Sequence, residues 1–154
     1  MRGLKIMLVG RFQKDFFREA FEFYLKRVKW YTQAEVAEVK EGRHKDPGLR
    51  MQKEGENILA RVGPRDLLLI MDEKGRAMTS RSLAAELARW EEDPGCLPCF
   101  VVGGAFGLSE RVRSRADRTI SLGPMTLPHE LAAAVLMEQV YRALCINRGH
   151  PYHH

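Results

Sequence analysis

Two short, uninterrupted apolar runs are the feature of this sequence that most restricts its fold. Residues 66–71 read DLLLIM and residues 98–102 read PCFVV, without the alternation that marks a strand exposed on one face. Such runs are typical of strands covered on both faces of a parallel sheet. Segments with helical spacing separate the expected strands, as βαβ units require. We therefore expect an α/β fold with a largely parallel sheet.

The remaining elements follow from shorter patterns. Further strands are expected at residues 4–9, 34–39 and 118–122, the second near a sheet edge because glutamates alternate with its valines. Helices are expected at residues 16–28, 49–62, 80–90 and 128–146, with a short one opening at Ser109. Residues 40–48, between the strand expected at 34–39 and the helix expected at 49–62, are expected to form a mobile basic loop. No linker divides the chain, so residues 1–154 are expected to form one domain.

Composition narrows the class of protein. No apolar segment approaches the roughly 20 residues that cross a bilayer, and three cysteines are too few for a disulfide-stapled secreted domain. A cytoplasmic protein with no membrane partner is expected. The net charge of +5 favours a polyanionic partner. Cys96 and Cys99 have the CxxC spacing of redox and half-zinc sites, but no second pair follows, and we expect no metal.

Three strand ends carry unusual residues, and in parallel sheets such ends meet in one crevice. They are residues 71–75 (MDEKG), residues 103–107 (GGAFG) and residues 122–129 (LGPMTLPH). The glycines of the second allow close approach of the backbone to a ligand. This second segment lacks the glycine spacing of the dinucleotide-binding fingerprint, and it lacks the lysine of a P-loop. Taken alone, this loop fits an ordinary turn as well as a ligand cradle.

Taken together, the motifs GGAFGLS, SLGPMTLPHEL and a closing HPYH are more specific. In this order and near these spacings they resemble the RlmH family of SPOUT-type RNA methyltransferases. The resemblance runs the length of the chain and implies a trefoil knot in its carboxyl-terminal part. It also implies a homodimer with S-adenosylmethionine (SAM) as cofactor. The implied substrate is a pseudouridine of large-subunit ribosomal RNA, methylated at N3, alone or in the assembled ribosome.

The same resemblance assigns the residues that bind the cofactor. Cofactor binding falls on Met71, Gly103, Gly104, Leu122, Gly123, Pro124, Met125, Thr126 and Leu127. The candidate catalytic residues are Tyr152, His153, Arg142 and His129. We expect residues 149–154 to dock near the methyl group and help to remove the N3 proton, although a frayed end remains an alternative. His129 can instead orient the loop before the last helix.

Three further expectations concern surfaces. Phe106 is expected in the core, with stacking on adenine or RNA as the alternative. The last helix is apolar on all sides, which favours a homodimer built on it. Phosphate contacts are expected mainly in the basic loop, and the candidates are Arg11, Lys14, Lys26, Arg27, Lys29, Lys40, Arg43, His44 and Lys45.

Two other functions fit parts of the sequence. A non-catalytic ribosome-binding or assembly factor would keep the fold and bind no cofactor. A nucleotide hydrolase is disfavoured because the chain has no P-loop lysine and no acidic cluster for Mg²⁺ beyond Asp72 and Glu73.

Overall fold

The computed structural model describes residues 3–154 and contains a five-stranded sheet in which every neighbouring pair is parallel. The strand order is β2-β1-β4-β3-β5. The strands are β1 (Gly3–Val9), β2 (Gln33–Val39), β3 (Asp66–Ala77), β4 (Leu97–Val102) and β5 (Arg118–Ser121). The expected parallel sheet, with β2 at an edge, is confirmed. Met1 and Arg2, part of the expected domain, lie outside the described residues.

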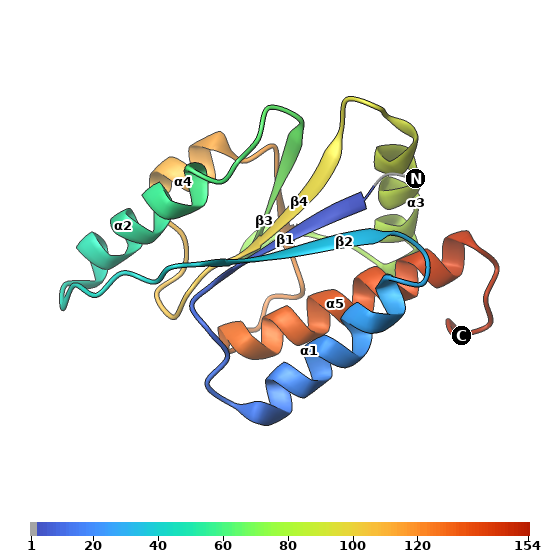
Figure 1. Cartoon of the computed structure of the whole chain (residues 1–154), viewed down its shortest axis with the longest axis horizontal. Helices are drawn as coiled ribbons and strands as arrows, with labels where there is room; N and C mark the ends of the chain where they lie inside the picture. The colour runs from blue at the N-terminus through green and yellow to red at the C-terminus, as the bar shows by residue number, and fades with distance from the viewer. Residues whose placement is uncertain (1–2) are drawn as a thin grey trace.

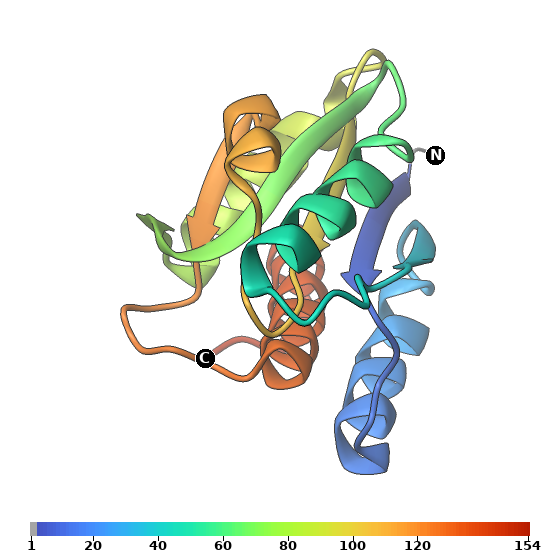
Figure 2. The ribbon, with the colours of Figure 1, turned by 90° about the vertical axis from the view of Figure 1, so that its left-hand side faces the viewer.

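Helices cover both faces of the sheet (Figures 1 and 2). One face carries α1 (Asp15–Val28), α3 (Ser80–Glu92) and α5 (His129–Asn147). The other carries α2 (Pro47–Leu59) and α4 (Glu110–Arg115). Successive residues of a strand point to opposite faces, so each central strand serves two cores. Ile6 packs towards α5, for example, and Met7 packs towards α2 and α4.

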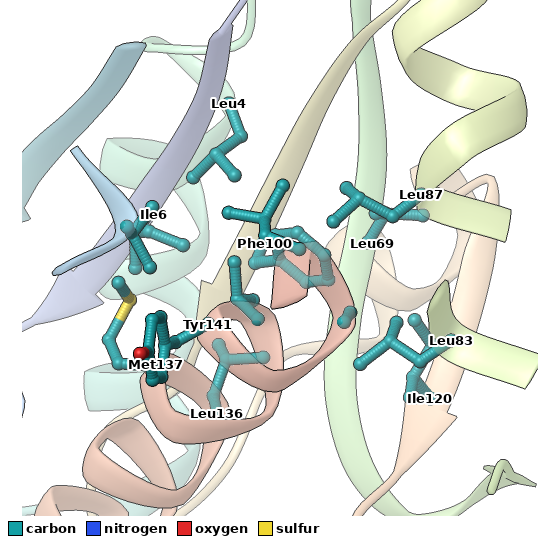
Figure 3. Packing of buried hydrophobic residues seen from close by; sticks show 14 of the residues in the cluster. Leu4, Ile6, Leu69, Leu83, Leu87, Phe100, Ile120, Leu136, Met137 and Tyr141 are labelled. Atoms are coloured by element: carbon teal, nitrogen blue, oxygen red, sulfur yellow. The ribbon is translucent and has the colours of Figure 1, made fainter. Parts of the chain in front are cut away.

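The two apolar runs are buried as the sequence predicts. Leu69 and Phe100 are fully buried beneath α3 and α5 (Figure 3). Leu68 and Val101 are fully buried on the opposite face. Burial on both sides explains why neither strand alternates with polar residues.

Much of helix α5 is buried within its own chain. It packs between α1 and α3 and against the sheet (Figure 1). Its fully buried residues include Met137, Val140 and Leu144. Packing within the chain therefore accounts for part of the apolar character of this helix, residues such as Leu131 and Val135 stay half-buried, and the expected homodimer stays a prediction.

Several element boundaries differ from the predicted ones. Helix α2 begins at Pro47, because Asp46 caps it by accepting from the Leu49 N–H at 2.9 Å, and the basic loop is correspondingly shorter. Pro128 is the N-cap of α5 and not its first helical residue. Strand β3 continues beyond Met71 to Ala77.

Candidate active site

A large cavity lies at the carboxyl ends of β3, β4 and β5. Its volume is about 740 Å³, which suits a ligand of the size of SAM because small-molecule sites span about 300 to 1,000 Å³. It is walled by a bulge of β3 (residues 72–75), the glycine loop (residues 103–108) and the wall segment (residues 122–128). The predicted cofactor residues that line it are Met71, Gly103, Gly104, Leu122, Gly123, Met125, Thr126 and Leu127. Pro124, in the same wall segment, is exposed and does not line it.

The β3 bulge replaces the loop expected at the first strand end. Met71 and Arg76 pair with the same residue of β5, so residues 72–75 arch out between them. Gly75 lets the strand return close to β5, because a Cβ there would lie 2.7 Å from the carbonyl of Thr119. The bulge thus turns the middle of a strand into one wall of the cavity.

Hydrogen bonds tie the wall segment to this bulge. The Thr126 hydroxyl donates to the Glu73 carboxylate at 2.5 Å. The buried Ser121 hydroxyl lies 3.1 Å from the Glu73 carbonyl oxygen and accepts from the Gly123 N–H at 3.0 Å. Gly123 has φ +138°, a conformation that favours glycine. Ser121 was not predicted as a site residue, and its place directly before the wall segment is the only sequence signal for it.

The glycines of the glycine loop allow close packing within the protein. A Cβ on Gly103 would lie 3.0 Å from the Leu108 side chain. One on Gly104 would lie 3.1 Å from Oε1 of the buried Glu54. A side chain at either position would therefore crowd atoms of the protein itself. The glycines set the path of the loop, and the path of the loop shapes the cavity.

Phe106 is not a core residue, so the expectation from sequence is wrong. Its side chain is 50% exposed and lines the cavity. The guanidinium carbon of Arg50 lies 5.4 Å from its ring centroid, within cation–π range. The glycine loop therefore places this ring at the cavity, beside Arg50 of α2.

The four predicted catalytic residues do not lie together in one chain. His129 is the first residue of α5 and lines the cavity. Arg142 lies 13 residues further along α5, which corresponds to about 20 Å of helix. The residues Tyr152 and His153 are held beside Arg142 and not beside the cavity.

These three residues form a closing cluster with Glu138. Arg142 donates to the Glu138 carboxylate through Nη2 at 2.5 Å, and the Tyr152 hydroxyl donates to the same oxygen at 2.9 Å. Nη1 of Arg142 lies 3.2 Å from Nδ1 of His153. The Tyr152 ring packs 4.7 Å from that of Tyr141, between centroids. Residues 149–154 are therefore docked on α5, not frayed, and Glu138 joins the site residues named from sequence.

The hydrogen bonds of the closing cluster restrict its chemistry. Burial raises the pKa of the Tyr152 hydroxyl, and its bonds with Tyr24 and Glu138 add to the shift, so Tyr152 is a donor at neutral pH. An arginine has donors only, so Nδ1 of His153 accepts, and a neutral ring then carries its proton on Nε2. In this arrangement neither side chain is placed to act as a general base, because Nδ1 of His153 faces Arg142 and the Tyr152 hydroxyl keeps its proton. Both are suited to position a nucleobase.

The cysteine pair has no sign of redox chemistry. Cys99 lies fully buried in β4, and burial, with the nearby Asp66 carboxylate, raises its pKa to about 12. A thiol with so high a pKa is a poor nucleophile at neutral pH. Cys96, Cys99 and Cys145 form no disulfide bond.

Several predicted basic residues share a groove at the carboxyl ends of β1 and β2. The groove measures about 560 Å³, and its cations are Arg11, Lys40, Arg43 and Arg61. Arg61 was missed because it lies at the end of α2, far from the basic loop in sequence. Lys14, Lys26, Lys29, His44 and Lys45 are exposed elsewhere, and Arg27 stacks on the Phe23 ring at 3.5 Å.

Two other kinds of feature are absent from the described part of the chain. Across residues 3–154, no helix has the length and apolar character that crossing a membrane needs. Over the same residues, no group of three or more His, Cys, Asp or Glu side chains is placed to hold a metal ion.

Comparison with known proteins gave matches over nearly the whole chain. Residues 2–153 match the family described as "Predicted SPOUT methyltransferase". A protein of Solidesulfovibrio magneticus named "Ribosomal RNA large subunit methyltransferase H" is 47% identical over 154 residues, covering 100% of both chains. Proteins of the same name from Maridesulfovibrio salexigens and Nitratidesulfovibrio vulgaris are each 44% identical over 155 residues, covering 100% of this chain and 99% and 100% of theirs. The matched residues include both the cavity and the closing cluster.

Proposed function

Because the chain belongs to the SPOUT methyltransferase family and is a methyltransferase that acts on large-subunit ribosomal RNA, we propose that it methylates ring N3 of a pseudouridine. SAM supplies an electrophilic methyl group when bound. The observation that carries the proposal is the cavity, in which three separate strand ends converge on predicted cofactor residues. The expected trefoil knot stays a prediction.

The cofactor is assigned to the cavity through backbone and apolar groups. The glycine loop and the wall segment present carbonyl and N–H groups without bulky side chains, as recognition of adenine and ribose requires. Phe106 and Met125 are exposed at the rim, 50% and 79% respectively, and offer apolar surface to the bound ligand.

A homodimer brings the two halves of the site together. Phe16, Phe23 and Trp30 recur every seven residues and are 62%, 49% and 60% exposed, an unusual apolar stripe on α1 and the turn after it. Beside α1, the α5 residues Leu131 and Val135 are only half-buried. A two-fold axis across this layer pairs the helices antiparallel. The closing cluster of one subunit then faces the cavity of the other.

We expect Phe16→Glu combined with Phe23→Glu to convert the dimer to a monomer, because two buried charges would face each other across the axis. Light scattering should give about twice 17.6 kDa for the unaltered protein and about 17.6 kDa for the variant. Leu49→Glu, a matched change at a 51% exposed residue of α2, should stay dimeric. An unaltered protein that is monomeric and active would contradict this assignment.

The closing cluster positions the target base. Methyl transfer is an in-line displacement, so N3 must point at the methyl carbon while its proton leaves. The Arg142 guanidinium, oriented by Glu138, stabilises the negative charge that develops on the imide. His153 offers its Nε2 N–H to a ring carbonyl, and Tyr152, whose hydroxyl donates to Glu138, holds that carboxylate beside Arg142. His129 lines the cavity itself and stays a candidate for the group that accepts the N3 proton.

The basic groove is assigned to phosphates of the RNA. Its cations adjoin Gly10 and Arg11, which also border a small pocket between the end of β1 and His129. A strand of RNA lying in this groove is therefore led towards the cavity. Cations that neutralise phosphates release counterions and make binding depend on salt.

We expect Lys40→Gln with Arg43→Gln to weaken RNA binding and to reduce the slope of log affinity against log salt by about 0.7 to 0.9 for each phosphate that is no longer neutralised. Filter binding of a large-subunit rRNA fragment at several salt concentrations measures this slope. Arg89→Gln, at an exposed residue of α3, is the matched control. An unchanged slope in the double variant would place the phosphate contacts elsewhere.

Mass spectrometry of large-subunit rRNA from cells with and without this chain tests the function directly. One methyl group on a pseudouridine should be absent without the chain and return with it. Calorimetry with SAM distinguishes this function from that of a non-catalytic assembly factor, because such a factor would show no saturable SAM binding.

A further inference from the structure

One wall of the cavity contains an enclosed ion pair that the cofactor assignment does not use. Asp72, in the β3 bulge, contacts Nη1 of Arg113 on α4. Both residues line the cavity, and their side chains are 11% and 34% exposed. The pair therefore forms part of the cavity wall.

Backbone groups hold each partner in place. The Lys74 N–H donates to Oδ1 of Asp72 at 2.8 Å, and Nε of Arg113 donates to the Leu108 carbonyl at 3.2 Å. Burial alone would raise the pKa of Asp72, but the Lys74 N–H and the Arg113 guanidinium outweigh it and lower that pKa. Asp72 is therefore ionised at neutral pH, and the cavity wall carries two fixed charges of opposite sign.

Capacity for further hydrogen bonds remains on both partners. Nη2 of Arg113 has no acceptor within residues 3–154 and lies 3.9 Å from the position of a Cβ built on Gly107, at the mouth of the glycine loop. The Asp72 carboxylate can accept more than its present bonds. The other two charged residues that line the cavity are less suited to bind a charged ligand group. Glu73 is exposed and bonded to Thr126, and Lys74 is exposed.

We propose that Asp72 and Arg113 bind the amino-acid end of SAM, Asp72 receiving its ammonium group and Arg113 its carboxylate. The inference rests on the proposed function, in which this cavity holds SAM. A zwitterion that enters a partly enclosed site loses hydration and needs charged partners in return. The adenosine part is uncharged and is served by the glycine loop and wall segment, so the ion pair distinguishes ligands with an amino-acid end from those without one.

Two available ligands separate this role from a structural one. S-adenosylhomocysteine keeps the amino-acid end, whereas 5′-methylthioadenosine keeps the adenosine and thioether and lacks it. Calorimetry with both ligands on the full-length protein gives an affinity ratio for each variant. The variants are Asp72→Asn and Arg113→Gln, which remove charge with little change of shape. Arg111→Gln, at a residue of α4 outside the cavity lining, is the matched control.

We expect each site variant to bind S-adenosylhomocysteine about tenfold or more weakly, the effect of removing a charge-assisted hydrogen bond. Binding of 5′-methylthioadenosine should change less than about twofold. Arg113→Lys should recover part of the preference, because it keeps the charge without the planar fork. Arg111→Gln should keep the full ratio.

Equal weakening for both ligands would overturn the inference and make the pair a purely structural tie between α4 and β3. Melting temperatures of the same variants show whether folding is affected, and Arg113→Lys keeps the test open if Arg113→Gln does not fold. If the unaltered protein prefers S-adenosylhomocysteine to 5′-methylthioadenosine and the site variants keep the same affinity ratio, this inference fails and the proposed function stands. If the unaltered protein binds neither ligand, both fail.

Discussion

We expect a chain truncated after Arg148 to bind SAM normally and to methylate rRNA about 10²-fold or more slowly, because positioning of the reacting groups contributes a factor of at least that size. The cavity is built from strand ends and from the start of α5, so it does not need residues 149–154. The closing cluster does need them, because Tyr152 and His153 complete its hydrogen bonds with Glu138 and Arg142. Single-turnover kinetics with saturating SAM measures the decrease in rate.

Point variants separate chemistry from packing, since truncation also uncovers the Tyr141 ring. Tyr152→Phe keeps the ring and removes the hydroxyl, and Arg142→Gln removes the charge. Both should lower kcat while leaving SAM affinity within about twofold. His154→Ala is the control, because that side chain is exposed and outside the closing cluster. A truncated enzyme that works at the full rate would return catalysis to His129.

Subunit mixing tests whether the two halves of the site come from different chains. Co-expression of the truncated chain with a Gly103→Val chain should yield about a quarter of normal activity, because about half of the dimers are mixed and each has one complete site. If cluster and cavity acted within one chain, mixing would restore nothing.

The second large effect is expected for Gly103→Val, which should abolish measurable SAM binding. A Cβ there would lie 3.0 Å from the Leu108 side chain and 3.2 Å from the Gly107 carbonyl carbon, so the loop must move. Overpacking of this kind costs about 1 to 3 kcal/mol, which a folded domain tolerates. The displaced loop, rather than a side chain filling the cavity, is the physical cause. Calorimetry with SAM and a thermal melt measure both effects.

Gly95→Val is the matched control for this change. Gly95 is exposed in the turn before β4, and a Cβ there would lie 3.4 Å from Oδ1 of Asp93. That variant should bind SAM as the unaltered protein does. A folded Gly103→Val protein with unchanged SAM affinity would show that the glycine loop is not part of the cofactor site.

The sequence alone determined the elements whose causes are local. The apolar runs at residues 66–71 and 98–102 predicted strands buried on both faces, because a strand lacks polar alternation when both its sides pack against helices. Ser109 marked a helix start through a side chain that bonds the next turn of its own helix. Converging strand ends predicted the cavity, because parallel strands deliver their carboxyl ends to one edge.

Only the tertiary structure decided what depends on contacts between distant segments. Residues 72–75 form a bulge because β5 pairs with β3 on both sides of them. Phe106 is half exposed because the path of the glycine loop places its ring at the cavity, beside Arg50 of α2. Arg142 meets Tyr152 and His153 because the segment after α5 folds back along it, about 20 Å from His129. Such pairings are set by the path of the backbone through space, which periodicity and motif spacing do not encode.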